Sequence, residues 1–104
     1  MDIYTLREKV LAGQYQVSRH ADIERTRENL AVGDLVTAIL SGDIIAVDID
    51  PERGTEYLVE GSTWTKERLR VKVGIDDAGE VVFITVYPRK RKRARGKSQR
   101  KGKR

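Results

Sequence analysis

The stretch LRVKVGIDDAGEVVFITVY, residues 69–87, decides the fold class of this chain. In its first part apolar residues alternate with Arg70 and Lys72, which predicts a β-strand with one solvated face. The sequence DDAG, residues 76–79, is typical of a hairpin loop, and the apolar run after it predicts a second strand. These two strands are therefore expected to form an antiparallel hairpin.

The residues before this hairpin predict two more strands and the helices. Period-two apolar patterns predict strands at 44–49 and 57–63, each a sequential neighbour of the next. Residues 15–18 alternate only briefly and are expected to be extended. Helical spacing and stop signals predict a helix of about ten residues that ends at Gly13, a second from Ser18 through Arg27, and a third from Asp34 to Gly42. The expected fold is α+β, with two to three N-terminal helices packed on a four-stranded antiparallel meander.

Charge is divided sharply along the chain. The last seventeen residues hold eleven Lys or Arg and no acidic residue, whereas the rest holds ten basic and sixteen acidic residues. A cationic arm predicts a polyanionic partner, because each Lys or Arg that neutralises a phosphate releases a condensed counterion. The alternative is a tail that confers solubility and binds nothing specific. The expected organisation is a folded domain at 1–88 and a disordered polybasic tail at 89–104.

The composition excludes several classes of site. The chain has no cysteine and one histidine, His20, so disulfides, thiolate sites and His-rich metal sites are excluded. It also lacks a phosphate-binding glycine loop and a nucleophile elbow. We therefore expect no metal and no small-molecule cofactor. No apolar run approaches the length of a membrane span and the start lacks a signal peptide's apolar stretch, so a cytoplasmic protein without a membrane partner is expected.

Residues 18–27, SRHADIERTR, concentrate groups that could act on a phosphodiester. His20, Glu24 and Arg27 recur at helical spacing and share a face, with Arg25 beside it. Histidine suits general acid or base catalysis, and arginine binds phosphate. Metal-free RNA cleavage needs a base for the ribose 2′-OH, an acid for the leaving oxygen and cations on the phosphate. The alternative is an ordinary charged helix in which these groups form ion pairs.

Two aromatic residues are further candidates. Phe83, Thr85 and Tyr87 are expected to share one face of the last strand, and Tyr87 directly precedes the tail. There it could stack on a base or contact a phosphate, whereas the alternative is an aromatic that covers the sheet. Trp64 in a turn is interpreted as a lid on the core, with a stacking platform as the alternative.

Short motifs follow one another in a fixed order along residues 3–88. They are Tyr15-x-Val17-Ser18-x-His20-Ala21-x-x-x-Arg25, Leu40-x-Gly42-x-Ile44-Ile45, Leu58-Val59-x-Gly61, Leu69-x-Val71-x-Val73 and Val82-x-Ile84-x-Val86-Tyr87. In this order they resemble a family of small prokaryotic domains of unknown function. That family is in turn distantly similar to RelE-type and BrnT-type ribonuclease toxins.

This resemblance implies the small α+β toxin-nuclease fold and a metal-independent ribonuclease or RNA-binding activity. It implies His20 and Arg25 as the polar pair of the site, with Tyr87 at the end of the final strand. Members often carry a histidine where this chain has Arg70, so a second imidazole is missing here and Arg70 is left to bind phosphate. The partners implied are RNA, with DNA as the alternative, and an antitoxin protein.

The resulting hypothesis is a metal-independent endoribonuclease with His20, Arg25, Arg70 and Tyr87 as its catalytic set. The predicted nucleic-acid contacts are Arg27, Arg89, Lys90, Arg91, Lys92, Arg93, Arg95, Lys97, Arg100 and Lys101. One alternative is a non-catalytic nucleic-acid-binding module, for instance a ribosome-associated one. Another is a protein-interaction domain with a basic tail.

Overall fold

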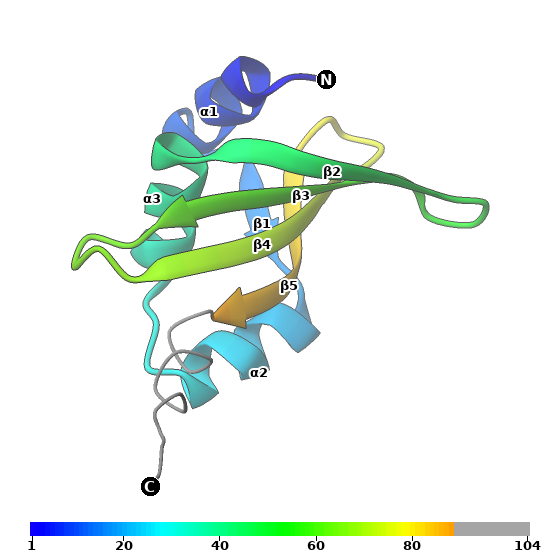
Figure 1. The fold of residues 1–104 in the computed structure, drawn as a ribbon. Helices are drawn as coiled ribbons and strands as arrows, with labels where there is room; N and C mark the ends of the chain where they lie inside the picture. The colour runs from blue at the N-terminus through cyan, green and yellow to red at the C-terminus, as the bar shows by residue number, and fades with distance from the viewer. Residues whose placement is uncertain (89–104) are drawn as a thin grey trace, which may run out of the picture.

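The structure, a computed structural model, describes residues 1–88 and has an α+β fold (Figure 1). The predicted tail disorder and the predicted nucleic-acid contacts at 89–104 lie outside the described residues. The elements are, in chain order, α1 (Ile3–Leu11), β1 (Tyr15–Val17), α2 (Arg19–Arg27), α3 (Val32–Ser41), β2 (Asp43–Asp50), β3 (Gly54–Ser62), β4 (Arg68–Ile75) and β5 (Val81–Pro88). No helix within residues 1–88 is long and apolar enough to cross a membrane.

The sheet has the strand order β1-β5-β4-β3-β2. Strands β2 to β5 form the predicted antiparallel meander. The predicted number of four strands is wrong, however, because β1 adds a fifth strand that pairs with β5 in parallel, Tyr15 opposite Val81 and Val17 opposite Phe83. The prediction of an extended segment at 15–18 is confirmed, but three residues are too few to predict pairing, and this strand forms because the backbone of β5 offers it hydrogen bonds.

Helices α1 and α3 pack on one face of the sheet, with α3 against β3 and β4 and α1 against α3. The core between these layers is formed by apolar residues of both, among them Leu6, Leu35, Ile39, Val59, Val71 and Phe83. Gly61 lets α3 approach β3 closely, since a Cβ there would collide with the carbonyl oxygen of Ala38. The opposite face of the meander carries charged residues of β3 and β4, including Glu60 and its direct neighbour Arg70.

The helix starts agree with the prediction at α2 and differ at α3. Ser18 caps α2 as predicted, since its side chain accepts the backbone N–H of Ala21 at 3.1 Å. Helix α3 begins at Val32, before the predicted cap Asp34. The Asp34 carboxylate instead reaches back from the first turn and accepts the backbone N–H of Ala31 at 2.8 Å.

A β-bulge in β5 changes which of its side chains face the core. Lys72 pairs with Thr85 and Val73 with Phe83, so one extra residue, Ile84, lies between the paired positions. Such an insertion reverses the alternation of side chains beyond it. Phe83 and Val86 are therefore both buried, and the predicted common face of Phe83, Thr85 and Tyr87 is wrong.

The turn between β2 and β3 is closed by Asp50. Its Oδ1 accepts the backbone N–H groups of Arg53 and Glu52, each at 2.8 Å. Because these bonds favour the charged form, they hold the pKa of Asp50 below its usual value. This hairpin turn lies at the opposite end of the sheet from the C-terminal end of β5, as the strand register requires.

Candidate nucleic-acid interface

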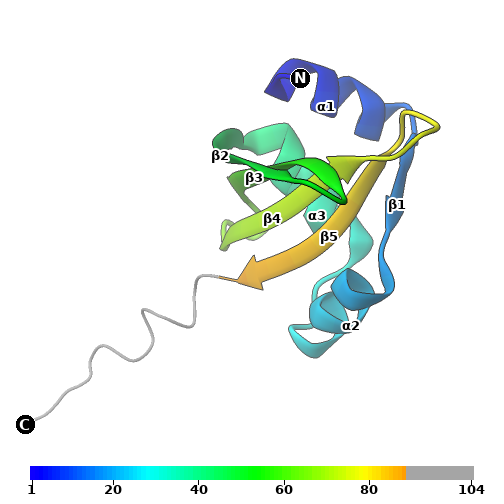
Figure 2. The ribbon, with the colours of Figure 1, turned by 90° about the vertical axis from the view of Figure 1, so that its right-hand side faces the viewer.

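Helix α2 completes the edge of β5 where β1 stops (Figure 2). The backbone N–H of Ser18 donates to the carbonyl of Phe83 at 2.9 Å, and its hydroxyl donates to the carbonyl of Ile84 at 3.2 Å. One turn later, Glu24 Oε1 accepts the backbone N–H of Val86 at 3.2 Å. A side-chain carboxylate thus satisfies a strand N–H that β1 is too short to reach.

The same carboxylate oxygen also contacts His20, the only histidine of the chain. His20 Nε2 lies 3.3 Å from Glu24 Oε1, and the imidazole side chain is 64% exposed. The carboxylate therefore faces Nε2, and Nδ1 is the ring nitrogen that Glu24 does not contact. The arrangement is an exposed imidazole whose carboxylate partner is itself fixed by the sheet.

Arg70 and Tyr87 are direct cross-strand neighbours in β4 and β5. Tyr87 is 42% exposed, and it follows the residue that Glu24 binds. Arg70 Nε donates to Glu60 Oε2 at 3.0 Å, while Arg68 contacts the other oxygen of Glu60 at 2.9 Å. The guanidinium of Arg70 therefore lies on the charged face of the sheet, in an ion pair with the neighbouring strand.

Three of the four predicted catalytic residues are connected to the last residues of β5: Arg70 pairs with Tyr87, and His20 is linked through Glu24 to Val86. We call His20, Glu24, Arg70 and Tyr87 the β5 corner. Its members come from α2, β4 and β5, and Val86 connects them through its bond to Glu24 and its peptide link to Tyr87. The polybasic tail follows Pro88 directly, so the sequence joins the tail to the domain at this corner.

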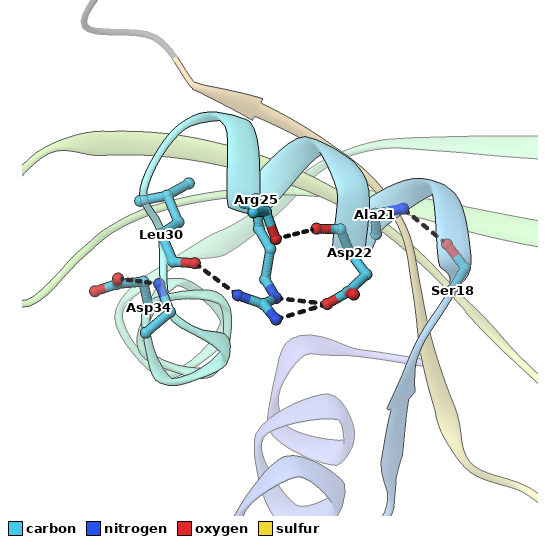
Figure 3. A network of polar contacts seen from close by, with 8 residues as sticks. Ser18, Ala21, Asp22, Arg25, Leu30 and Asp34 are labelled. Carbon is cyan, nitrogen blue, oxygen red and sulfur yellow. Dashed lines mark hydrogen bonds and ion pairs between the residues drawn. The ribbon is translucent and has the colours of Figure 1, made fainter.

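Arg25, the fourth predicted catalytic residue, has a structural role (Figure 3). Its Nε and Nη2 contact Asp22 Oδ1 at 2.8 and 2.7 Å, and its Nη1 donates to the carbonyl of Leu30 at 3.1 Å. The guanidinium thus connects α2 to the turn before α3 and does not join the β5 corner. Arg27, the predicted phosphate contact, is exposed in the last turn of α2.

Trp64 is 83% exposed in the turn between β3 and β4, so its interpretation as a lid on the core is wrong. The polar neighbours Thr63, Thr65 and Lys66 were the sequence signal for an exposed turn. The hydrogen bond from the backbone N–H of Val86 to Glu24 could not be predicted from the sequence, because the two residues are 62 positions apart. Among residues 1–88, no group of three or more His, Asp or Glu side chains could hold a metal ion.

Comparison with known proteins identifies a family and no function. The family model described as "Domain of unknown function (DUF4258)" matches residues 17–88, which is more than half of the chain. The match runs from the end of β1 through β5 and includes all residues of the β5 corner. No curated protein and no solved structure matches the chain. The similarity to RelE-type and BrnT-type toxins, and the antitoxin it implies, stay predictions. The protein is a member of the DUF4258 family of domains of unknown function.

Proposed function

We propose that the protein is a metal-independent endoribonuclease and that the β5 corner is its site. One observation carries this proposal: Glu24 Oε1 lies within 3.3 Å of both His20 Nε2 and the backbone nitrogen of Val86. An exposed base oriented by a fixed carboxylate is the arrangement that general-base catalysis needs. RNA is the substrate implied by the distant similarity that we expect between this family and ribonuclease toxins.

The reaction follows from the groups at the corner. His20 Nδ1 removes the proton of a ribose 2′-OH, and the 2′-oxygen attacks the adjacent phosphorus to give a 2′,3′-cyclic phosphate. Glu24 stabilises the imidazolium that forms, as a carboxylate does for a catalytic histidine. The leaving 5′-oxygen takes its proton from water, because the chain has no second imidazole.

The remaining groups bind and position the substrate. Arg70 offsets charge on the scissile phosphate, and Tyr87 stacks on the flanking base. The domain itself is acidic and repels RNA, so the tail from Arg89 onward supplies the affinity without sequence preference. Because the tail begins at Arg89, directly after the last residue of β5, RNA bound by the tail is held next to the β5 corner.

A non-catalytic RNA-binding module is the second candidate, and one observation favours it. Both arginines of the predicted catalytic set are already in ion pairs, Arg25 with Asp22 and Arg70 with Glu60. If these pairs persist when RNA binds, only the tail and the exposed aromatic side chains contact the RNA. His20 then has no chemical role.

Cleavage of a labelled single-stranded RNA in excess EDTA separates the two candidates. His20→Ala is expected to lower the rate by about 100-fold or more, which is the usual contribution of a general base. Glu24→Gln is expected to lower it less, since the amide still accepts from Val86 but no longer stabilises an imidazolium. Glu52→Gln, the same change at an exposed position in the β2–β3 turn, is the matched control and should cleave normally.

Two outcomes contradict the nuclease. One is equal cleavage by wild type and a folded His20→Ala variant, and the other is no cleavage by either protein. Salt-sensitive RNA binding by both proteins, together with the second outcome, establishes the binding module instead.

A further inference from the structure

Trp64 is the sole tryptophan of the chain and the most exposed of its large hydrophobic residues within 1–88, at 83%. Its indole contributes little to the core from this position. A large aromatic presented to water on an ordered turn is a typical contact residue, because stacking against a partner removes its apolar surface from water.

Backbone and side-chain hydrogen bonds fix the turn that carries Trp64. Thr63 is buried, and its backbone N–H donates to the carbonyl of Glu67 at 2.9 Å. Its hydroxyl accepts the backbone N–H of Glu67 at 3.1 Å, and its carbonyl accepts that of Lys66 at 3.0 Å. Lys66 adopts a left-handed conformation with φ of 71°. Trp64 is therefore exposed on a defined turn, and its backbone loses little entropy when a ligand binds.

The indole of Trp64 lines a shallow hollow of mixed apolar and polar character. Its volume is about 350 Å³, at the small end of the range of roughly 300–1,000 Å³ for small-ligand sites. The lining residues are Thr37, Ser41, Ser62, Thr63, Trp64 and Lys66. The Ser41 hydroxyl accepts the backbone N–H of Ser62 at 3.0 Å, which holds the end of α3 against β3 beside the hollow. The indole plane and the ammonium group of Lys66 line the hollow together, and a nucleobase with its phosphate can use both.

The strand register places this turn at the same end of the sheet as the β5 corner. Ser62 pairs with Arg68, and the next residue of β4, Leu69, pairs with Pro88 of β5. Since β4 alone separates β3 from β5, the two strands lie roughly 10 Å apart. A single-stranded RNA held by the tail at Pro88 therefore reaches the turn within a few nucleotides.

We propose that Trp64 is a stacking platform for an unpaired nucleobase and that Lys66 contacts a neighbouring phosphate. The stacking platform rests on the proposed function only for the choice of RNA as the ligand, and it does not require that the protein cleaves RNA. Single-stranded nucleic acid is the favoured occupant because Lys66 lines the hollow beside the indole, and the cationic tail follows Pro88 at the same end of the sheet. The platform and the β5 corner bind different nucleotides of one strand.

Intrinsic fluorescence tests the proposal directly, because all tryptophan emission comes from Trp64. The full chain is titrated with a single-stranded oligouridylate, a blunt RNA duplex of the same length, and inorganic polyphosphate. Stacking predicts strong quenching by the single strand and little by the duplex or by polyphosphate, although the tail binds all three. Equal quenching by polyphosphate would overturn the proposal, since it would show an effect of charge alone.

A variant series measures the contribution of the stack. Trp64→Ala is expected to weaken oligouridylate binding by about ten-fold or more, whereas Trp64→Phe retains most of the affinity. Tyr4→Ala removes another exposed aromatic, on α1, and should leave binding unchanged. Unchanged affinity of Trp64→Ala would contradict the platform even if the protein cleaves RNA. Quenching and loss of affinity without any cleavage would support the platform while the nuclease fails.

Discussion

Glu24 and Val86 are joined by a hydrogen bond from the backbone N–H of Val86 to the Glu24 carboxylate at 3.2 Å. Strand β1 pairs with β5 only as far as Phe83. Beyond that point, a side chain of α2 supplies the hydrogen-bond acceptor that a neighbouring strand would otherwise provide. The same oxygen lies 3.3 Å from His20 Nε2. One carboxylate therefore belongs both to the fold and to the proposed site.

This double role predicts different results for two substitutions of Glu24. Glu24→Ala leaves the buried N–H of Val86 without an acceptor, which should destabilise the domain by about 1–3 kcal/mol and speed hydrogen exchange at that amide. Glu24→Gln keeps an acceptor oxygen, so the amide should stay protected while RNA cleavage slows. Amide exchange followed by NMR measures both effects. Equal protection of Val86 in the wild type and in Glu24→Ala would show that the bond is not significant.

The close approach of α3 to β3 predicts a strong effect at Gly61. A Cβ at this position collides with the Ala38 carbonyl, which is helix backbone and cannot turn aside. Gly61→Ala should therefore lower the free energy of unfolding by about 3 kcal/mol or more. Gly33→Ala is the matched control, because nothing lies within 4 Å of a Cβ there and alanine favours the helix by roughly 0.5–1 kcal/mol. Urea denaturation of both variants measures the free energy of unfolding. A similar decrease in Gly61→Ala and Gly33→Ala would contradict the expected clash.

The contacts of Arg25 predict that it acts on stability and that Arg27 acts on binding. Lys at position 25 cannot contact Asp22 and the Leu30 carbonyl together, so Arg25→Lys should cost about 1 kcal/mol of stability, a value already reduced for the partial exposure of the pair. It should leave the salt dependence of RNA binding unchanged. Arg27→Ala should reduce that salt slope by about 0.7, the value for one phosphate contact with a single strand. A reduced slope in Arg25→Lys would show that Arg25 contacts phosphate after all.

The divided charge predicts how the tail contributes. Deletion of residues 89–104 removes eleven cations and leaves an acidic domain. Each phosphate contact adds about 0.7 to the salt slope for a single strand, so the slope should become much flatter. Fluorescence anisotropy with a labelled RNA at several salt concentrations measures it. An unchanged slope would mean that the tail does not bind the RNA.

The sequence predicted the parts of the fold that carry a local signal. Alternating apolar residues marked β4, the DDAG loop marked the hairpin to β5, and Ser18 was correctly identified as the cap of α2. The pairing of β1 and the bulge at Ile84 depend on the neighbouring strand, which no local sequence pattern encodes.

The sequence likewise predicted only those features of the candidate site that carry a local signal. The spacing of His20 and Glu24 predicted that they share a helix face, and in the structure they are in contact. Tyr87 and Arg70 could be named from their residue types. The position of the end of β5 beside α2 could not be predicted, since it depends on a hydrogen bond between residues 62 positions apart.

We propose that single-stranded RNA lies across one end of the sheet, at the β5 corner. Backbone amide chemical shifts of the ¹⁵N-labelled full chain, recorded while a short non-cleavable 2′-deoxy or 2′-O-methyl oligonucleotide is added, test it most directly. Within residues 1–88 we expect the largest changes at the β5 corner, that is at His20, Glu24, Arg70 and Tyr87, with the β2–β3 turn around Asp50 unchanged as an internal reference. Changes confined to the tail, or centred on the β2–β3 turn, would contradict it.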